Sequence, residues 1–207
     1  MNYRITGTGS CIPDITKKNS DFLENKFLDT DGGKFQSSNS EIIDKFNSIT
    51  GINERRYAPD EINCSDLAAV AAGLAINDSK LDQETLDYII VAHNTGDISC
   101  SSGQVDTLPS VASKVKAKLK IKNPNCVAYD IICGCPGWVE GIIQAKSFIK
   151  SGMAEKCLVI GCDTLSRILD ENDRDSMIYA DGSGAIILES DNSYDGGILS
   201  HKSATFT

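Results

Sequence analysis

Apolar residues gather in five short runs along the chain, and each run has the length and composition of a β-strand. The runs are rich in β-branched residues, and polar or glycine-containing stretches bound them, which is typical of buried strands. They cover residues 3–8, 86–92, 126–132, 156–161 and 184–189.

Between these runs, apolar residues recur at the spacing of one helix face. In residues 41–50 this face is formed by Ile42, Ile43, Phe46 and Ile49, with Ser40 as a candidate N-cap and Gly51 as a stop. The same spacing predicts helices over residues 66–77, over residues 109–119 with Pro109 first, and from Pro136 to Ser151.

Strands that alternate with helices predict an α/β domain: a mostly parallel mixed sheet flanked by helices, as one unit over residues 1–207. The polar residues 25–40 and the charged residues 170–179 are predicted to be exposed excursions. The glycine-rich stretches at residues 7–9 and 181–184 lack the context of a phosphate-binding loop, so they predict tight turns and close backbone packing.

Charge and cysteine usage narrow the class of protein. A net charge of −9 argues against nucleic acid or an anionic membrane as the main partner. No run is long enough to cross a bilayer, and the first residues alternate like a strand, so we expect a cytoplasmic protein. The eight cysteines are expected to be reduced, because several lie inside apolar runs. No metal site is expected, since Cys133 and Cys135 have no second pair at ligand spacing and neither histidine is clustered.

The stretch AYDIICGCPGWVE joins a predicted strand to a predicted helix. Gly134 permits a sharp turn and Pro136 suits the first helical position, which puts Cys135 at the N-cap. The helix dipole and free amides there favour a thiolate, which is the nucleophilic form of cysteine. From the residues alone, a nucleophile and an inert cysteine at a tight turn are equally open interpretations.

Several motifs in order along the chain resemble the first half of β-ketoacyl-acyl-carrier-protein synthase III, a member of the thiolase-like superfamily. The resemblance covers nearly the whole chain, with extra residues around 31–38. It runs through ITGTGS at residues 5–10, TGINERR at 50–56, the stretch 130–137, GCDTLSR at 161–167 and the stretch from Asp173 to Ala185.

The resemblance implies a thiolase-like fold, half of a layered α-β-α-β-α architecture, and an acyltransferase of fatty acid biosynthesis. Cys135 then takes an acyl group from acyl-coenzyme A, with its own amide in the oxyanion hole. Decarboxylated malonyl-acyl-carrier protein attacks that thioester in a Claisen condensation. No cofactor is implied, because the coenzyme A thioester is a substrate.

Two further residues are assigned through the resemblance. Arg174 matches an arginine that contacts coenzyme A; a solvated arginine among acidic neighbours is the alternative. Leu108 matches a residue that enters the acyl pocket of the second subunit of a homodimer; a locally packed loop leucine is the alternative. The tryptophan and arginine that sandwich the adenine in the family fall here near Lys45 and on Ile49, which leaves the mode of adenine binding open.

The histidine and asparagine that activate the nucleophile and drive decarboxylation in the family have no counterpart here, since His93 and His201 do not match their motifs. We therefore expect condensation to need a missing C-terminal half, whose absence would expose apolar surface. Five lysines at alternate positions could provide positive charge for docking an acidic acyl-carrier protein: Lys114, Lys116, Lys118, Lys120 and Lys122. The alternative is that these lysines form only a solvated surface.

Other functions compete with this hypothesis. A hydroxymethylglutaryl-coenzyme A synthase or a polyketide synthase would share the strand–helix turn. A non-catalytic partner subunit would bind a carrier protein or complete a dimer, although the presence of Cys135 disfavours it. A redox pair of Cys133 and Cys135 ranks last, because a disulfide across one residue is strained.

Overall fold

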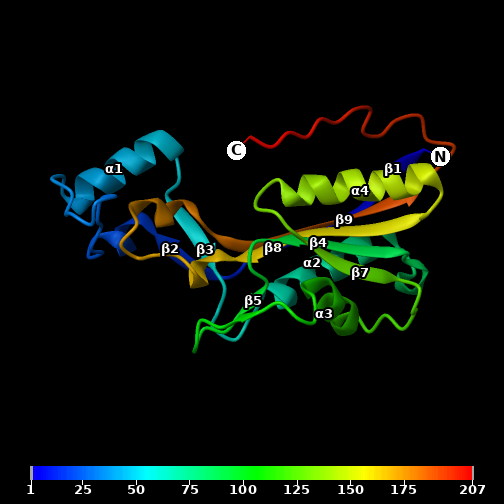
Figure 1. The fold of residues 1–207 in the computed structure, drawn as a ribbon, viewed down its shortest axis with the longest axis horizontal. Coiled ribbons are helices and arrows are strands. Elements are labelled where there is room, and N and C mark those ends of the chain that lie inside the picture. The colour runs from blue at the N-terminus through cyan, green and yellow to red at the C-terminus, as the bar shows by residue number, and fades with distance from the viewer. Residues whose placement is uncertain (1, 207) are drawn as a thin grey trace.

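The computed structural model describes residues 2–206, and its centre is a five-stranded sheet (Figure 1). The spatial order of the strands is β1-β9-β8-β4-β7. β4 pairs in parallel with β7 and β8, whereas β9 is antiparallel to both of its neighbours. Only β9 therefore runs against the other four, which confirms a mixed and mostly parallel sheet. The strands are β1 (Tyr3–Cys11), β4 (Tyr88–His93), β7 (Val127–Ile132), β8 (Lys156–Thr164) and β9 (Asp181–Ser190).

Helices cover both faces of the sheet and make a layered α/β domain (Figure 1). On one face, α2 (Cys64–Ser79) and α3 (Val111–Lys118) share a core with the sheet. On the other face, α4 (Gly137–Ser151) builds a second core with Ile142, Ala145 and Ile149. All four predicted helices are present, and three of them, α2, α3 and α4, form the two helical layers.

The glycines of β1 allow α2 to pack directly on the sheet. A Cβ atom at Gly9 would lie 2.2 Å from the carbonyl oxygen of Ala71, and one at Gly7 would lie 2.2 Å from that of Ala75. The stretch Gly7-Thr8-Gly9 is thus a site of close backbone packing, as the sequence predicted.

All four helices start one or two residues from the predicted position, and at α1 and α3 the cap explains the difference. α1 (Asn39–Thr50) is capped by Ser38 rather than Ser40, because Ser38 and Glu41 form a reciprocal capping box. α3 begins at Val111 rather than Pro109, since Ser110 is its N-cap and the Ser110 hydroxyl accepts from the amide of Ser113. The predicted stop at Gly51 is confirmed, with φ at +70°.

A small lobe stands apart from the sheet (Figure 1). It contains α1, the strand pair β2 (Ile15–Lys18) and β3 (Glu54–Tyr57), and the 3-10 helices η1 (Asn19–Phe22) and η4 (Arg174–Ile178). Its own core holds Phe22, Phe27, Ile42, Ile43 and Met177. Residues 170–179 are therefore not wholly exposed, because Met177 anchors them in this core.

The remaining short elements are a two-stranded hairpin and two further 3-10 helices. The hairpin consists of β5 (Asp97–Ile98) and β6 (Val105–Asp106), and the 3-10 helices are η2 (Gln83–Thr85) and η3 (Leu165–Arg167). Across residues 2–206, no helix combines the length and the apolar character that crossing a membrane requires.

Candidate active site

The turn between β7 and α4 is a tight elbow that carries Cys135. The amide of Gly137 donates to the carbonyl of Gly134 at 3.0 Å and closes the turn. Pro136 is the N-cap, with helical backbone angles, and its carbonyl accepts from Glu140 at 3.0 Å. Cys135 thus lies one residue before the N-cap, a shift of one from the predicted position, because Pro136 takes up the cap itself.

Small residues bring α4 close to the sheet behind the elbow. A Cβ atom at Gly137 would lie 3.1 Å from that of Ala92, and one at Gly141 would lie 2.9 Å from Cγ1 of Val159. The first turn of α4 therefore rests directly on β4 and β8, which fixes where the elbow presents its thiols.

Cys135 lies on the wall of an open hollow of about 260 Å³ at the carboxyl ends of β4 and β8. The side chains of Cys133 and Cys135 are both exposed, but only Cys135 lines this hollow. In α/β folds, ligands commonly bind beyond the carboxyl ends of the strands. Other lining residues are Ala92, Trp138, Gly161, Cys162, Asp163, Leu165 and Ser183.

Asn94 and Asp163 form a clamp beside the elbow. Asn94 donates from its backbone amide at 2.9 Å and from Nδ2 at 2.8 Å to the two carboxylate oxygens of Asp163. Burial raises the pKa of Asp163, and the hydrogen bonds from Asn94 offset only part of that rise. Oδ1 of Asn94 lies 3.6 Å from where a Cβ of Gly134 would stand, so the clamp also faces the turn.

A second pair, the buried His93 and the partly buried Asp130, lies under the start of α3. Asp130 accepts from the amides of Val111 at 2.7 Å and Ala112 at 2.8 Å, and its Oδ2 is 3.0 Å from Nε2 of His93. Burial would raise the pKa of Asp130, but these hydrogen bonds outweigh it and lower that pKa. His93 therefore has a partner that the sequence did not reveal, and it does not line the Cys135 hollow.

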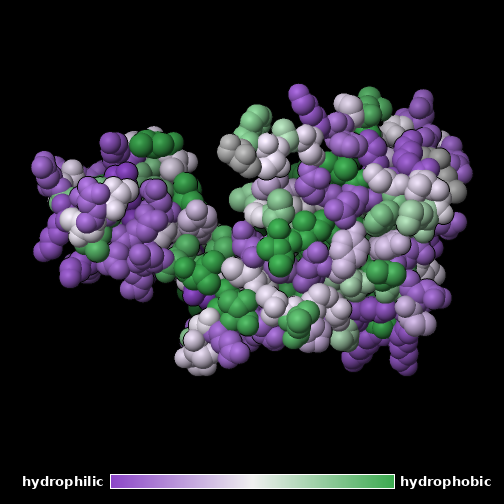
Figure 2. Space-filling view, viewed as in Figure 1, coloured by the Kyte–Doolittle hydropathy of each residue, from purple (hydrophilic) through white to green (hydrophobic). Residues whose placement is uncertain are grey.

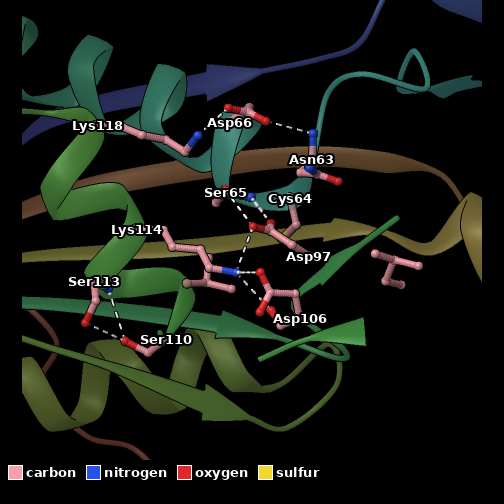
Figure 3. A network of polar contacts seen from close by, with 12 residues as sticks. Asn63, Cys64, Ser65, Asp66, Asp97, Asp106, Ser110, Ser113, Lys114 and Lys118 are labelled. Atoms are coloured by element: carbon pink, nitrogen blue, oxygen red, sulfur yellow. Dashed lines mark hydrogen bonds and ion pairs between the residues drawn. The ribbon is translucent and has the colours of Figure 1, made fainter. Parts of the chain in front are cut away.

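Leu108 lies away from the hollow, on the loop between β6 and α3, with 83% of its surface exposed. Both ends of this loop are held. Lys114 bonds to Asp97 at 3.1 Å and to Asp106 at 2.8 Å, and Asp97 also accepts from the amide of Ser65 at 2.7 Å (Figure 3). Leu108 is therefore exposed to solvent on a loop whose ends are held by hydrogen bonds.

Arg174 lies at the start of η4 and lines a different pocket, of about 290 Å³, in the small lobe. Lys45 and Ile49 line the same pocket, and the resemblance puts the family's adenine-binding pair near Lys45 and on Ile49. Phe35 is stacked on the Arg174 guanidinium at 4.8 Å. The structure thus brings these sequence-derived positions together, but apart from Cys135.

Three of the lysines offered for carrier-protein docking are engaged within the chain. Lys114 holds the hairpin, Lys116 bonds the carbonyls of Asn123 and Cys126 at 2.7 Å, and Lys118 pairs with Asp66 at 2.6 Å. These three lysines are therefore not freely available to dock an acidic partner. Across residues 2–206, the structure contains no group of three or more histidine, cysteine or acidic side chains placed to hold a metal ion.

Comparison with known proteins gives one family of enzymes, by sequence and by fold. The family model of 3-oxoacyl-[acyl-carrier-protein (ACP)] synthase III matches residues 129–205. The chain is 38% identical over 190 residues, 91% of its length, to the β-ketoacyl-[acyl-carrier-protein] synthase III of Neisseria gonorrhoeae, of which it covers 52%. Over 201 residues it is 37% identical to synthase III 1 of Vibrio cholerae, covering 97% of this chain and 56% of the relative.

The fold leads to the same relatives. The crystal structure of 3-oxoacyl-[acyl-carrier-protein] synthase III from Aquifex aeolicus superposes with a TM-score of 0.73 at 32% identity, covering 93% of this chain and 55% of that one. The chain thus spans about half the length of the relatives it matches. In sequence and in fold, the chain is therefore similar to about half of a β-ketoacyl-[acyl-carrier-protein] synthase III.

Proposed function

We propose that this chain is the nucleophile-bearing, N-terminal part of a 3-oxoacyl-[acyl-carrier-protein] synthase III-like acyltransferase of fatty acid biosynthesis. The observation that carries the proposal is the exposed thiol of Cys135, which stands on the strand–helix elbow and lines the hollow. An accessible thiol just before a helix N-terminus suits nucleophilic catalysis.

In the first step, the Cys135 thiolate attacks the carbonyl carbon of an acyl-coenzyme A. The bond from that carbon to Sγ forms as its bond to the coenzyme A sulfur breaks, and coenzyme A leaves as a thiol after taking up a proton. The resemblance assigns the Cys135 amide to the developing oxyanion, where a fixed donor lowers the barrier.

In the second step, malonyl-acyl-carrier protein loses carbon dioxide and its carbanion attacks the acyl carbon held on Cys135. A carbon–carbon bond forms, the carbon–sulfur bond breaks, and the Cys135 thiolate is restored. The histidine and asparagine that this step needs have no counterpart in this sequence. We therefore propose that condensation requires a second half of the protein, whereas acyl transfer centres on Cys135.

The proposal extends to binding and assembly. Arg174 contacts the coenzyme A portion of the donor, which its place on the small-lobe pocket supports. Leu108 enters the acyl pocket of a second copy in a homodimer, which its exposure on an anchored loop supports. The acyl-carrier protein is the second partner, and the reaction takes place in the cytoplasm.

Acylation of single-cysteine variants tests the function. After incubation with acetyl-coenzyme A, intact-mass measurement should show one added acetyl group on the natural chain and on Cys133→Ala. Cys135→Ala should gain none while keeping its circular dichroism spectrum. Acetylation that persists in Cys135→Ala, or that disappears in Cys133→Ala, would refute the assignment of the nucleophile.

A further inference from the structure

The small-lobe pocket contains an internal contact at its arginine. The ring of Phe35 lies 4.8 Å from the centre of the Arg174 guanidinium, and both side chains line the pocket. Phe35 belongs to the extra residues around 31–38 that the family resemblance does not cover. The insertion thus supplies an aromatic face for Arg174 at that pocket.

The inserted segment is folded so that Phe35 is held in this position. A backbone bridge joins Leu28 to Lys34, and the Asp29 carboxylate accepts from the amide of Gly33 at 2.7 Å. Phe35 also packs against the core of the small lobe. The amide of Leu28 donates to Asn172 at 2.9 Å, which ties the insertion to the segment that carries Arg174.

The charges around the pocket do not favour a polyphosphate. Its cationic lining residues, Lys45 and Arg174, are matched by two carboxylates, Glu41 and Asp175. Asp175 lies 3.7 Å from Nε of Arg174. Hydrogen bonds from the backbone and side chain of Ser38 lower the pKa of Glu41, so its negative charge persists at neutral pH. A ligand with several phosphate groups would therefore meet no surplus of positive charge here.

We propose that Phe35 is a specificity-determining residue, which occupies a face of Arg174 that the nucleotide of a coenzyme A donor would otherwise use. A stacked base and the Phe35 ring would compete for one face of the Arg174 guanidinium. Phe35 has the advantage, because it is part of the chain and loses no translational freedom when it stacks, whereas a bound nucleotide does. The donor is then selected chiefly through its acyl group and pantetheine arm, and the contact of Arg174 with coenzyme A is weaker than an uncovered guanidinium would make. This inference rests on the proposed function, because it concerns the thioester that acylates Cys135.

Calorimetric titration of the full chain with coenzyme A, and separately with pantetheine, tests this competition. Phe35→Ala should bind coenzyme A about two- to fivefold more tightly than the natural chain, which is the value of an exposed cation–π contact. Its affinity for pantetheine, which lacks the nucleotide, should not change. The gain should disappear in the double variant Phe35→Ala/Arg174→Ala, whereas Phe35→Tyr, which keeps an aromatic face, should behave like the natural chain.

Phe46→Leu is the matched control, because Phe46 lines the same pocket but its ring lies over Arg55 at 5.9 Å rather than over Arg174. It should not tighten coenzyme A binding, because it uncovers no face of Arg174. Unchanged or weaker coenzyme A binding by Phe35→Ala would overturn the inference, as would an equal gain for pantetheine. If Phe35→Ala does not fold, the single variant Arg174→Ala tests the inference instead. A loss of coenzyme A affinity of less than about twofold supports competition, and a larger loss contradicts it. Acylation of Cys135 is measured separately, so its failure would count against the proposed function alone.

Discussion

At the scale of single residues, position decides which cysteine can react. Burial, with smaller effects from Asp87 and Cys126, raises the pKa of Cys157 to about 12, so this thiol stays protonated and inert. Cys135 is exposed at the elbow instead. The sequence correctly predicted this difference in exposure, because Cys157 lies inside an apolar strand whereas Cys135 lies between a glycine turn and a proline.

Asp130→Asn should lower the free energy of unfolding by about 1–3 kcal/mol at neutral pH, since an amide replaces a partly buried carboxylate that accepts three hydrogen bonds. The pKa of Asp130 is lowered in the folded state, so its stabilisation is present above the unfolded-state pKa of about 4 and is lost as the pH falls. Urea unfolding at several pH values measures this. The difference from the natural chain should shrink below about pH 4.

The exposed Asp106 provides the comparison for that experiment. Asp106→Asn should cost no more than about 1 kcal/mol at neutral pH, because exposed ion pairs contribute little. A loss in Asp130→Asn that is equally large at pH 3 and pH 7 would show that the ionised carboxylate is not the cause.

At the scale of elements, regular periodicity made the main strands and helices predictable. β2, β3, β5 and β6 were missed because strands of two to four residues carry too little periodicity to recognise. The Asn94–Asp163 and His93–Asp130 pairs were missed for another reason. Their members lie 69 and 37 positions apart, and only the register of β4 with its two neighbours brings them together.

The packing of α4 on the sheet gives a test at this scale. Gly141→Ala should destabilise the chain by about 1–3 kcal/mol, because the new Cβ would lie 2.9 Å from the buried Val159 and overpack the interface. Gly73→Ala on α2 is the matched control: its Cβ would meet nothing nearer than 3.9 Å, so it should stabilise by up to about 1 kcal/mol. Thermal unfolding of both variants measures this. A Gly141→Ala chain as stable as Gly73→Ala would show that α4 has room to shift.

At the scale of the whole molecule, the sheet domain and the small lobe leave apolar side chains at the surface. Figure 2 shows hydrophobic residues where the two parts meet. Exposed examples near the elbow are Ile132 and Val139, and Leu108 stands out on its loop. Because the chain spans about half the length of its relatives, such surface is what the proposed second half and second subunit would cover.

Leu108→Asp tests the proposed homodimer. The side chain is 83% exposed, so the circular dichroism spectrum of the chain should not change, whereas a charge placed in an apolar subunit pocket should abolish the dimer. Sedimentation equilibrium of the variant and the natural chain measures the assembly. A natural chain that sediments as a monomer, or a variant that dimerises equally well, would contradict the role of Leu108.

The central claim is that Cys135 is the acyl acceptor, and locating the acyl group on the natural chain tests it most directly. After brief exposure to acetyl-coenzyme A, the peptide that contains both Cys133 and Cys135 is isolated at acidic pH and fragmented in a mass spectrometer. The account predicts fragment ions that carry the acetyl group on Cys135 alone. An acetyl group on Cys133, on another cysteine, or on no cysteine would contradict it.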